Sequence, residues 1–191
     1  MKRSVRVLVC VLAISLGVPA VRAQLAAQTP LNDDARRDRT REQLAQLLAK
    51  VGPEVHVTFA QSQKNPYNYS GNLREGLANI EYFEIVFGVT SRNLISLRVF
   101  PFYKGNYINV DKVRDSLSLL RQLARLSDRA FLFWGADASG DVFTGYSFTL
   151  ESGFPEENIR TVLRSIANSD DFIGELRPAI DGSNAAPVPT R

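Results

Sequence analysis

The sequence predicts an α+β domain in which helices pack on a largely antiparallel five-stranded sheet. Three observations support this class. Apolar residues recur at helical spacing in three stretches, alternating apolar and polar residues occupy the segments between them, and short turns join most of these segments. Antiparallel strands can be joined by short turns, whereas parallel strands need long crossovers. The predicted order of elements is α-β-ββ-α-ββ-α.

The first helix is predicted to begin near residue 40, where Thr40-Arg41-Glu42-Gln43 matches a capping box. Gly52-Pro53 is expected to end it. The apolar residues of its buried face are Leu44, Leu47, Leu48 and Val51. Residues 55–59 alternate apolar and polar side chains, which predicts a strand. The polar composition of residues 60–78 predicts a long loop.

Two paired strands are predicted over residues 80–88 and 94–100, joined by the turn VTSRN. The side chains expected on their shared buried face are Phe83, Ile85, Phe87, Ile95, Leu97 and Val99. Asn109 is the predicted N-cap of a second helix. The apolar positions that share one face of that helix, and are expected to be buried, are Val110, Val113, Leu117, Leu120 and Ala124.

The stretch WGADASGDVFTG places Asp137, Ser139 and Asp141 at alternate positions, a spacing that calcium loops also show. An EF-hand loop needs a glycine after its third acidic position and a glutamate at its twelfth, and both are missing here. Apolar stretches over residues 130–135 and 142–150 flank the segment instead. We therefore predict a second hairpin, in which the two aspartates accept hydrogen bonds from backbone N–H groups of the turn.

Pro155 is predicted to start the last helix, because the missing N–H of proline costs least at the first helical position. The buried face of this helix is expected to contain Ile159, Val162, Leu163 and Ile166. Residues 24–34 and 177–191 lack apolar periodicity and are predicted to be unstructured. They flank a single predicted domain over residues 35–176.

The first 23 residues have the features of a secretory signal peptide. Basic residues come first, an apolar run follows from Val7 to Val18, and small residues precede an expected cleavage site before Gln24. The run of twelve residues is shorter than the roughly 20 that a membrane-spanning helix needs. We therefore expect cleavage, export to the periplasm or the medium, and no membrane span afterwards.

Cleavage would change the charge and the chemistry of the chain. Four basic residues and no acidic residue leave with the signal, so the formal net charge falls from +3 to −1. Nucleic-acid binding needs a basic surface, so we expect no nucleic-acid partner. The single cysteine, Cys10, also leaves with the signal, which excludes disulfides and thiolate sites from the remaining chain.

The stretch LSDRAFLFWGADASGDVFTGYSFTLESGFPEENIRTVLRSI runs from a helix end through two strands and an Asp/Gly turn to a helix start. Together with the order α-βββ-α-ββ-α, it resembles the YbjN-domain family, whose fold is like that of type III secretion chaperones. The resemblance covers about residues 35–176. The tyrosine-bearing loop before Ile80 and the export signal depart from the family's pattern. The resemblance implies a binding or regulatory domain that is often dimeric, and it carries over no active site.

No motif indicates catalysis. His56 is the only histidine, its position in the predicted strand favours exposure, and no Gly-x-Ser-x-Gly elbow is present. The carboxylates lack a metal-ligand spacing. We therefore expect no enzyme activity, cofactor or metal. Two alternatives stay open: a periplasmic hydrolase whose site forms only in the fold, and a structural subunit of an envelope or secretion assembly.

The expected partner is a protein or peptide. The candidate contact residues are Tyr67, Tyr69, Tyr103, Tyr107 and Trp134. Tyrosines in loops give contact area at small entropic cost. Trp134 alternates with Phe131 and Phe133 and is the aromatic side chain for which partial exposure is most expected, with burial in the core as the alternative. A homodimer is also predicted, because Leu119, Leu123 and Leu126 widen the apolar surface of the second helix.

Overall fold

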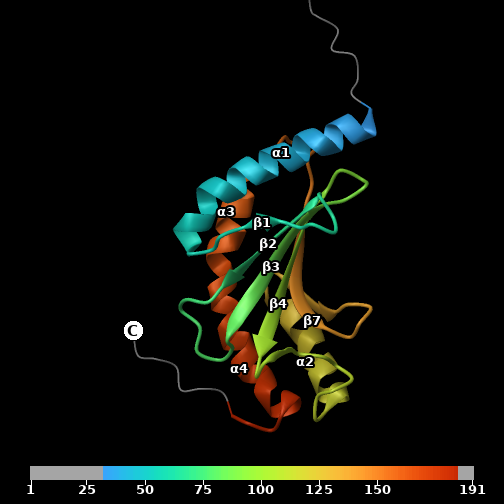
Figure 1. Cartoon of the computed structure of the whole chain (residues 1–191). Helices are drawn as coiled ribbons and strands as arrows, with labels where there is room; N and C mark the ends of the chain where they lie inside the picture. Colours follow the sequence, from blue (N-terminus) through green and yellow to red (C-terminus); the bar gives the residue numbers. More distant parts are fainter. Residues whose placement is uncertain (1–31, 185–191) are drawn as a thin grey trace, which may run out of the picture. The chain divides into compact units, whose positions relative to one another are not determined.

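The computed structural model describes residues 32–184, and within them one antiparallel sheet contains seven strands (Figure 1). The helices are α1 (Asp33–Val51), α2 (Ser116–Arg129), α3 (Glu156–Ser165) and α4 (Ser169–Ile180), with 3₁₀ turns at Gly52–Val55 and Ile166–Asn168. The strands are β1 (Ala60–Gln61), β2 (Asn68–Leu73), β3 (Tyr82–Val89), β4 (Ile95–Tyr103), β5 (Asn106–Tyr107), β6 (Phe133–Ala136) and β7 (Val142–Phe148). Their order in the sheet is β1-β2-β3-β4-β7-β6, and β5 pairs with β4. The α+β class is confirmed, and the expected five strands become seven.

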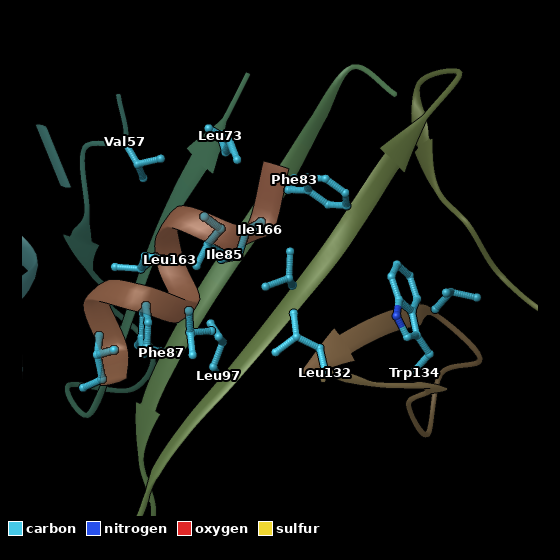
Figure 2. Close-up of a cluster of buried hydrophobic side chains, with 14 of the residues drawn as sticks. Val57, Leu73, Phe83, Ile85, Phe87, Leu97, Leu132, Trp134, Leu163 and Ile166 are labelled. Atoms are coloured by element: carbon cyan, nitrogen blue, oxygen red, sulfur yellow. The ribbon is translucent and has the colours of Figure 1, made fainter. Parts of the chain in front are cut away.

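One face of the sheet carries the hydrophobic core. Ile85 of β3 lies opposite Val99 of β4, and both side chains are completely buried. Figure 2 shows Leu163 and Ile166 projecting toward Ile85 from the helical segment that crosses these strands. Leu163 is 2% exposed and Ile166 is fully buried. The buried faces predicted for these two strands and for the last helix are therefore confirmed.

Helix α1 begins at Asp33, well before the predicted start. The side chain of Asn32 caps it by accepting a hydrogen bond from the Ala35 N–H at 2.7 Å. Thr40 lies inside the helix, where its hydroxyl donates to the Arg36 carbonyl at 3.1 Å. The predicted capping box was therefore wrong, although the four predicted apolar residues of this helix are all buried.

Residues 55–59 do not form the predicted strand. Gly52-Pro53 leads into a 3₁₀ turn, and the Val57 N–H donates to the Gly52 carbonyl at 2.9 Å. His56 takes a left-handed backbone conformation with a φ of 55°. Val57 nevertheless reaches the core and is 2% exposed. The alternation of side chains therefore correctly indicated which residue is buried but not the backbone conformation, because a tight bend can also bury every second residue.

The segment over residues 60–78, which was predicted to be a loop, contains the β1–β2 hairpin. β2 pairs with β3 along its whole length. Tyr69 and Leu73 point into the core, and Gly71 between them lies so close to the chain that an added Cβ would come within 2.7 Å of the Thr58 carbonyl oxygen. The other side chains of this strand are polar and face away from the core. This polar outer face concealed the strand from composition alone.

Helix α2 begins at Ser116, and the carboxylate of Asp115 caps it. Asn109, the predicted cap, is buried elsewhere: its amide group donates to the Asp141 carboxylate at 2.8 Å. The predicted helix start was therefore wrong. Asn109 instead ties the segment before α2 to the turn between β6 and β7.

The buried face of α2 is also rotated from the predicted one. Leu117 is 58% exposed and Leu120 is 47% exposed. The residues that are buried, against α4 and β6, are Leu119, Leu123 and Leu126. The prediction failed because Val110 and Val113 precede the helix, so the expected stripe joined residues that do not share one helix. The leucines proposed as a dimer surface consequently lie inside the chain.

The predicted hairpin turn lies between β6 and β7. The Asp137 carboxylate accepts hydrogen bonds from the N–H groups of Ser139 at 2.8 Å and of Asp141 at 3.0 Å. Gly140 has a φ of 82°, which glycine tolerates better than other residues. Within residues 32–184, no three His, Cys, Asp or Glu side chains are grouped so that they could hold a metal ion. Asp137 therefore caps the turn as predicted. The prediction for Asp141 was wrong, because its carboxylate accepts the side-chain amide of Asn109 at 2.8 Å instead.

The predicted tail over residues 177–191 begins within α4, an element that the sequence analysis did not anticipate. Asp170, in the first turn of α4, is only 3% exposed. Its carboxylate accepts hydrogen bonds from the backbone N–H of Ala78 at 2.7 Å and from that of Asn79 at 3.0 Å. The start of α4 is thereby joined to the segment that leads into β3.

Two carboxylates form ion pairs, and their protonation in acid is expected to lower the stability of the fold. A hydrogen bond from Lys104 holds the pKa of Asp181 far below its ordinary value, and one from Arg160 lowers the pKa of Glu54. A carboxylate with a lowered folded-state pKa stabilises the fold above its unfolded pKa of about 4, and this stability is lost as the pH falls below that value.

We therefore expect the free energy of unfolding, measured in urea, to decrease from about pH 5 to about pH 2. The variant Asp181→Asn should show a smaller decrease than the wild type over the same interval. Equal decreases in the two proteins would contradict the contribution of Asp181.

Candidate partner-binding face

The face of the sheet opposite the core carries a row of aromatic side chains, which we call the aromatic face. It consists of Tyr82 (β3), Phe100 and Phe102 (β4), Tyr107 (β5), Phe143 (β7) and Phe133 (β6). They lie on this side because their neighbours along the strands, such as Val99 and Trp134, point into the core. None of the six side chains joins the hydrophobic core formed by residues 32–184. Figure 1 shows α3 and α4 running along one side of β3 and β4.

The rings of the aromatic face contact one another in sequence across five strands. Centroid distances are 4.4 Å for Tyr82–Phe102, 5.4 Å for Phe102–Tyr107, 6.0 Å for Tyr107–Phe100, 5.8 Å for Phe100–Phe143 and 5.4 Å for Phe143–Phe133. These spacings are typical of favourable aromatic pairs. Phe133 is 47% exposed and Tyr107 is 36% exposed, whereas Phe143 is buried beneath its neighbours. The rings therefore support each other while two of them stay open to solvent.

A glycine makes room for the most exposed ring. Phe133 lies opposite Gly145 in the β6–β7 pairing. A Cβ on Gly145 would come within 2.7 Å of the Leu97 carbonyl oxygen and within 3.1 Å of the Phe133 ring. Because such contacts are closer than van der Waals distance, a larger residue at position 145 would displace the backbone of β4 and the Phe133 ring.

Two arginines flank the row and are not engaged in ion pairs within residues 32–184. The Arg74 guanidinium lies 4.4 Å from the centroid of the Tyr82 ring, and the Arg98 guanidinium lies 4.9 Å from that of Phe143. Both side chains are exposed. Their contacts with the rings are cation–π interactions, which leave the guanidinium N–H groups free to bind a carboxylate.

The two tyrosines of the aromatic face are held in the neutral form. Burial raises the pKa of the Tyr107 phenol, and its hydrogen bond to the Glu84 carboxylate raises that pKa further. Burial also raises the pKa of Tyr82, and the charge of Glu84 adds to the shift. Neither phenol therefore ionises near neutral pH, and the face presents apolar rings with hydrogen-bonding hydroxyl groups.

The structure separates the five residues expected to contact a partner. Tyr107 alone belongs to the aromatic face. Tyr69 is 8% exposed and Trp134 is 5% exposed, so both lie in the core, contrary to the expected exposure. Tyr67 is half-buried between β2 and α1, where its hydroxyl donates to Asp38 at 3.0 Å.

The hydrogen bond to Asp38 raises the pKa of Tyr67, and the Arg37 guanidinium lies 3.4 Å from the centroid of its ring. Tyr103 lies on the other side of β4 from the aromatic face, and its hydroxyl donates to the Asp181 carboxylate at 2.8 Å. Both side chains are thus committed to contacts within the chain.

The edge strand β6 is partly closed by α2. The Ser127 hydroxyl accepts a hydrogen bond from the Trp134 N–H at 2.7 Å and donates one to the Trp134 carbonyl at 2.9 Å. These backbone groups would otherwise be available to a further strand. Pairing of β6 with a strand of a second copy is therefore disfavoured at this position, and the homodimer stays a prediction.

His56 is exposed, and its Nδ1 lies 3.5 Å from the Glu75 carboxylate. Both side chains are more than 60% exposed, so they form no enclosed site. Among residues 32–184, no helix is both long and apolar enough to span a lipid bilayer. The predicted signal peptide and its cleavage site lie outside the described residues.

Comparison of the chain with protein-family models, with curated proteins and with solved structures gave no match. The likeness to YbjN-domain proteins consequently rests on the residues quoted above, and the candidate site rests on the geometry of the aromatic face.

Proposed function

We propose that this chain is an exported, non-enzymatic binding domain that holds an extended protein or peptide partner on its aromatic face. The observation that carries the proposal is the row of six contacting rings on a sheet face outside the hydrophobic core. Soluble proteins seldom expose contiguous apolar surface without a binding role. The chaperone-like function implied by the resemblance to YbjN-domain proteins agrees with a role of this kind.

The positive charges of two arginines beside the rings favour a partner that carries acidic residues. Arg74 and Arg98 approach opposite parts of the row and form no ion pair within residues 32–184. Aromatic rings and arginine are enriched among the residues that dominate binding energy at protein interfaces. A segment with apolar side chains flanked by Asp or Glu would therefore fit the face best.

Selection from a random peptide library on the immobilised chain tests this proposal. We expect the selected peptides to combine apolar and acidic residues, and the double variant Tyr107→Ser/Phe133→Ser to bind them about tenfold more weakly or worse. Arg98→Gln should weaken the binding of those peptides that carry acidic residues. Leu117→Ser is the matched control, because it removes an exposed apolar side chain from α2 and should leave the peptide affinity unchanged.

Equal peptide affinities of the wild type and the double variant would refute this role of the aromatic face. The two alternatives give other outcomes. A hydrolase would show turnover by the purified chain, and a structural subunit would be recovered in fixed stoichiometry with its neighbours. When the protein is recovered after export, a mass that corresponds to a start at Gln24 would support the signal peptide.

A further inference from the structure

The outward surface of α2 combines exposed leucines with arginines that have no ion-pair partner among the described residues. Leu117 is 58% exposed and Leu120 is 47% exposed, and they lie on one side of the helix. The opposite side packs on α4 and β6. Within residues 32–184, these two are the only large apolar side chains of a helix that are exposed to this degree.

Arg121 and Arg125 follow the leucines at helical spacing. Both are exposed, and neither forms an ion pair within residues 32–184. An open depression of about 300 Å³ lies among these side chains. Its lining consists of Asp115, Leu117, Ser118, Arg121, Gln122 and Arg125. Cationic and apolar groups thus face solvent together on one helix.

In the part of the chain that the structure describes, neither acidic residue of α2 and its cap forms an ion pair with these arginines. Asp115 accepts a hydrogen bond from the Ser118 N–H at 2.9 Å as the helix cap, and Asp128 lies three residues after Arg125 without forming an ion pair with it. Arg129 is paired with Glu175 of α4, so Arg121 and Arg125 are the arginines of the helix left open for an external anion.

We propose that α2 docks this domain on an anionic lipid surface, with Leu117 and Leu120 at the boundary of headgroups and acyl chains and Arg121 and Arg125 on the phosphates. Amphipathic helices with arginine beside an apolar stripe bind membrane surfaces in this way. Attraction to anionic lipids strengthens such binding and falls off within a Debye length.

A second copy of the chain fits this surface less well. Arg121 lies at the middle of the stretch from Leu117 to Arg125. A two-fold contact between antiparallel α2 helices would therefore bring Arg121 of one copy close to Arg121 of the other. Like charges at an interface are unfavourable, whereas lipid phosphates complement both arginines.

Co-sedimentation with lipid vesicles tests the proposal. The chain from Gln24 onward is suitable, because residues 32–184 contain a hydrophobic core of their own and the apolar run of the signal is removed. We expect binding to vesicles in which about one third of the phosphatidylcholine is replaced by phosphatidylglycerol. Binding to phosphatidylcholine alone should be weaker, and high salt should reduce binding to the anionic vesicles.

Two double variants assign the binding to α2. Arg121→Gln/Arg125→Gln should lower the partition coefficient on anionic vesicles by about fivefold per arginine, or roughly 25-fold together. Leu117→Ser/Leu120→Ser should lower it by about tenfold or more. The matched control is Lys64→Gln/Arg92→Gln, which removes two exposed charges from the β1–β2 and β3–β4 turns. This variant should bind the vesicles like the wild type. Circular dichroism would verify that every variant is folded.

Absence of binding to the anionic vesicles at low salt would overturn the proposal. So would unchanged binding of the α2 variants, or equal binding to neutral vesicles without salt dependence. A homodimer that dissociates on Leu117→Ser/Leu120→Ser would show that a second copy occupies the surface instead. Loss of vesicle binding in these variants with unchanged peptide affinity would separate this surface from the aromatic face.

Discussion

Replacing Asp170 with alanine is expected to lower the free energy of unfolding by about 3 kcal/mol or more. The carboxylate is 3% exposed and accepts the backbone N–H groups of Ala78 and Asn79 and the Asn79 side-chain amide. Alanine would remove this acceptor without admitting bulk water. Each buried donor that loses its acceptor costs about 1–3 kcal/mol.

A loss of this size is large for a domain whose total stability is of the order of 5–15 kcal/mol. Urea denaturation followed by circular dichroism would measure it. Asp171→Ala is the matched control, because Asp171 is exposed in the same helical turn and its removal should cost less than about 1 kcal/mol. The loss of stability for Asp170→Asn should lie between those of the two alanine variants, because asparagine keeps one acceptor oxygen. Similar stabilities of the Asp170→Ala and Asp171→Ala variants would show that the carboxylate does not hold the two segments together.

Replacing Phe87 with alanine is expected to cost about 3–5 kcal/mol. Phe87 is completely buried on the core face of β3, and its ring meets that of Phe59 edge to face with centroids 5.9 Å apart. Figure 2 shows it beneath the helical segment that carries Leu163. Truncation would leave a cavity among side chains held by the surrounding strands and helices, so only partial collapse is expected.

Val86→Ala provides the comparison, because Val86 is the preceding residue of β3 and is half-buried on the opposite face of the sheet. Its replacement should cost about 1 kcal/mol. Midpoints and slopes of urea unfolding curves give both values. If the two variants were equally stable, the assignment of Phe87 to the core face would be wrong.

Much of the aromatic face could have been predicted from side-chain alternation. Phe100 alternates with buried residues in the strand predicted over residues 94–100, and Phe102 continues the alternation beyond the predicted end of that strand. Phe143 alternates with Val142, which is fully buried. Tyr107 was among the tyrosines expected to contact a partner. Alternation shows that two sets of residues face opposite ways, but it does not show which set is covered.

Phe133 illustrates that limit. The sequence places Trp134 on the opposite side of the strand from Phe133, which is correct, but the partial exposure was expected for Trp134 and is found for Phe133. In the fold, α2 and α4 lie on the Trp134 side, and the Trp134 ring meets that of Phe172 at 6.1 Å. Position relative to these helices, which come from distant parts of the chain, decided which side is exposed.

The sequence by itself determined the elements that are specified by neighbouring residues. These are the β3–β4 hairpin, the Asp137 turn and the apolar face of α3, and in each the spacing of side chains or the turn chemistry acts over a few residues. Tertiary structure decided the rest. β2 is a strand because its backbone pairs with β3 despite a polar outer face. Asp170 joins α4 to the segment before β3 because the fold brings these two segments together. The rotation of α2 likewise follows from packing on α4 and β6. Such contacts join residues far apart in the chain, and no local spacing records them.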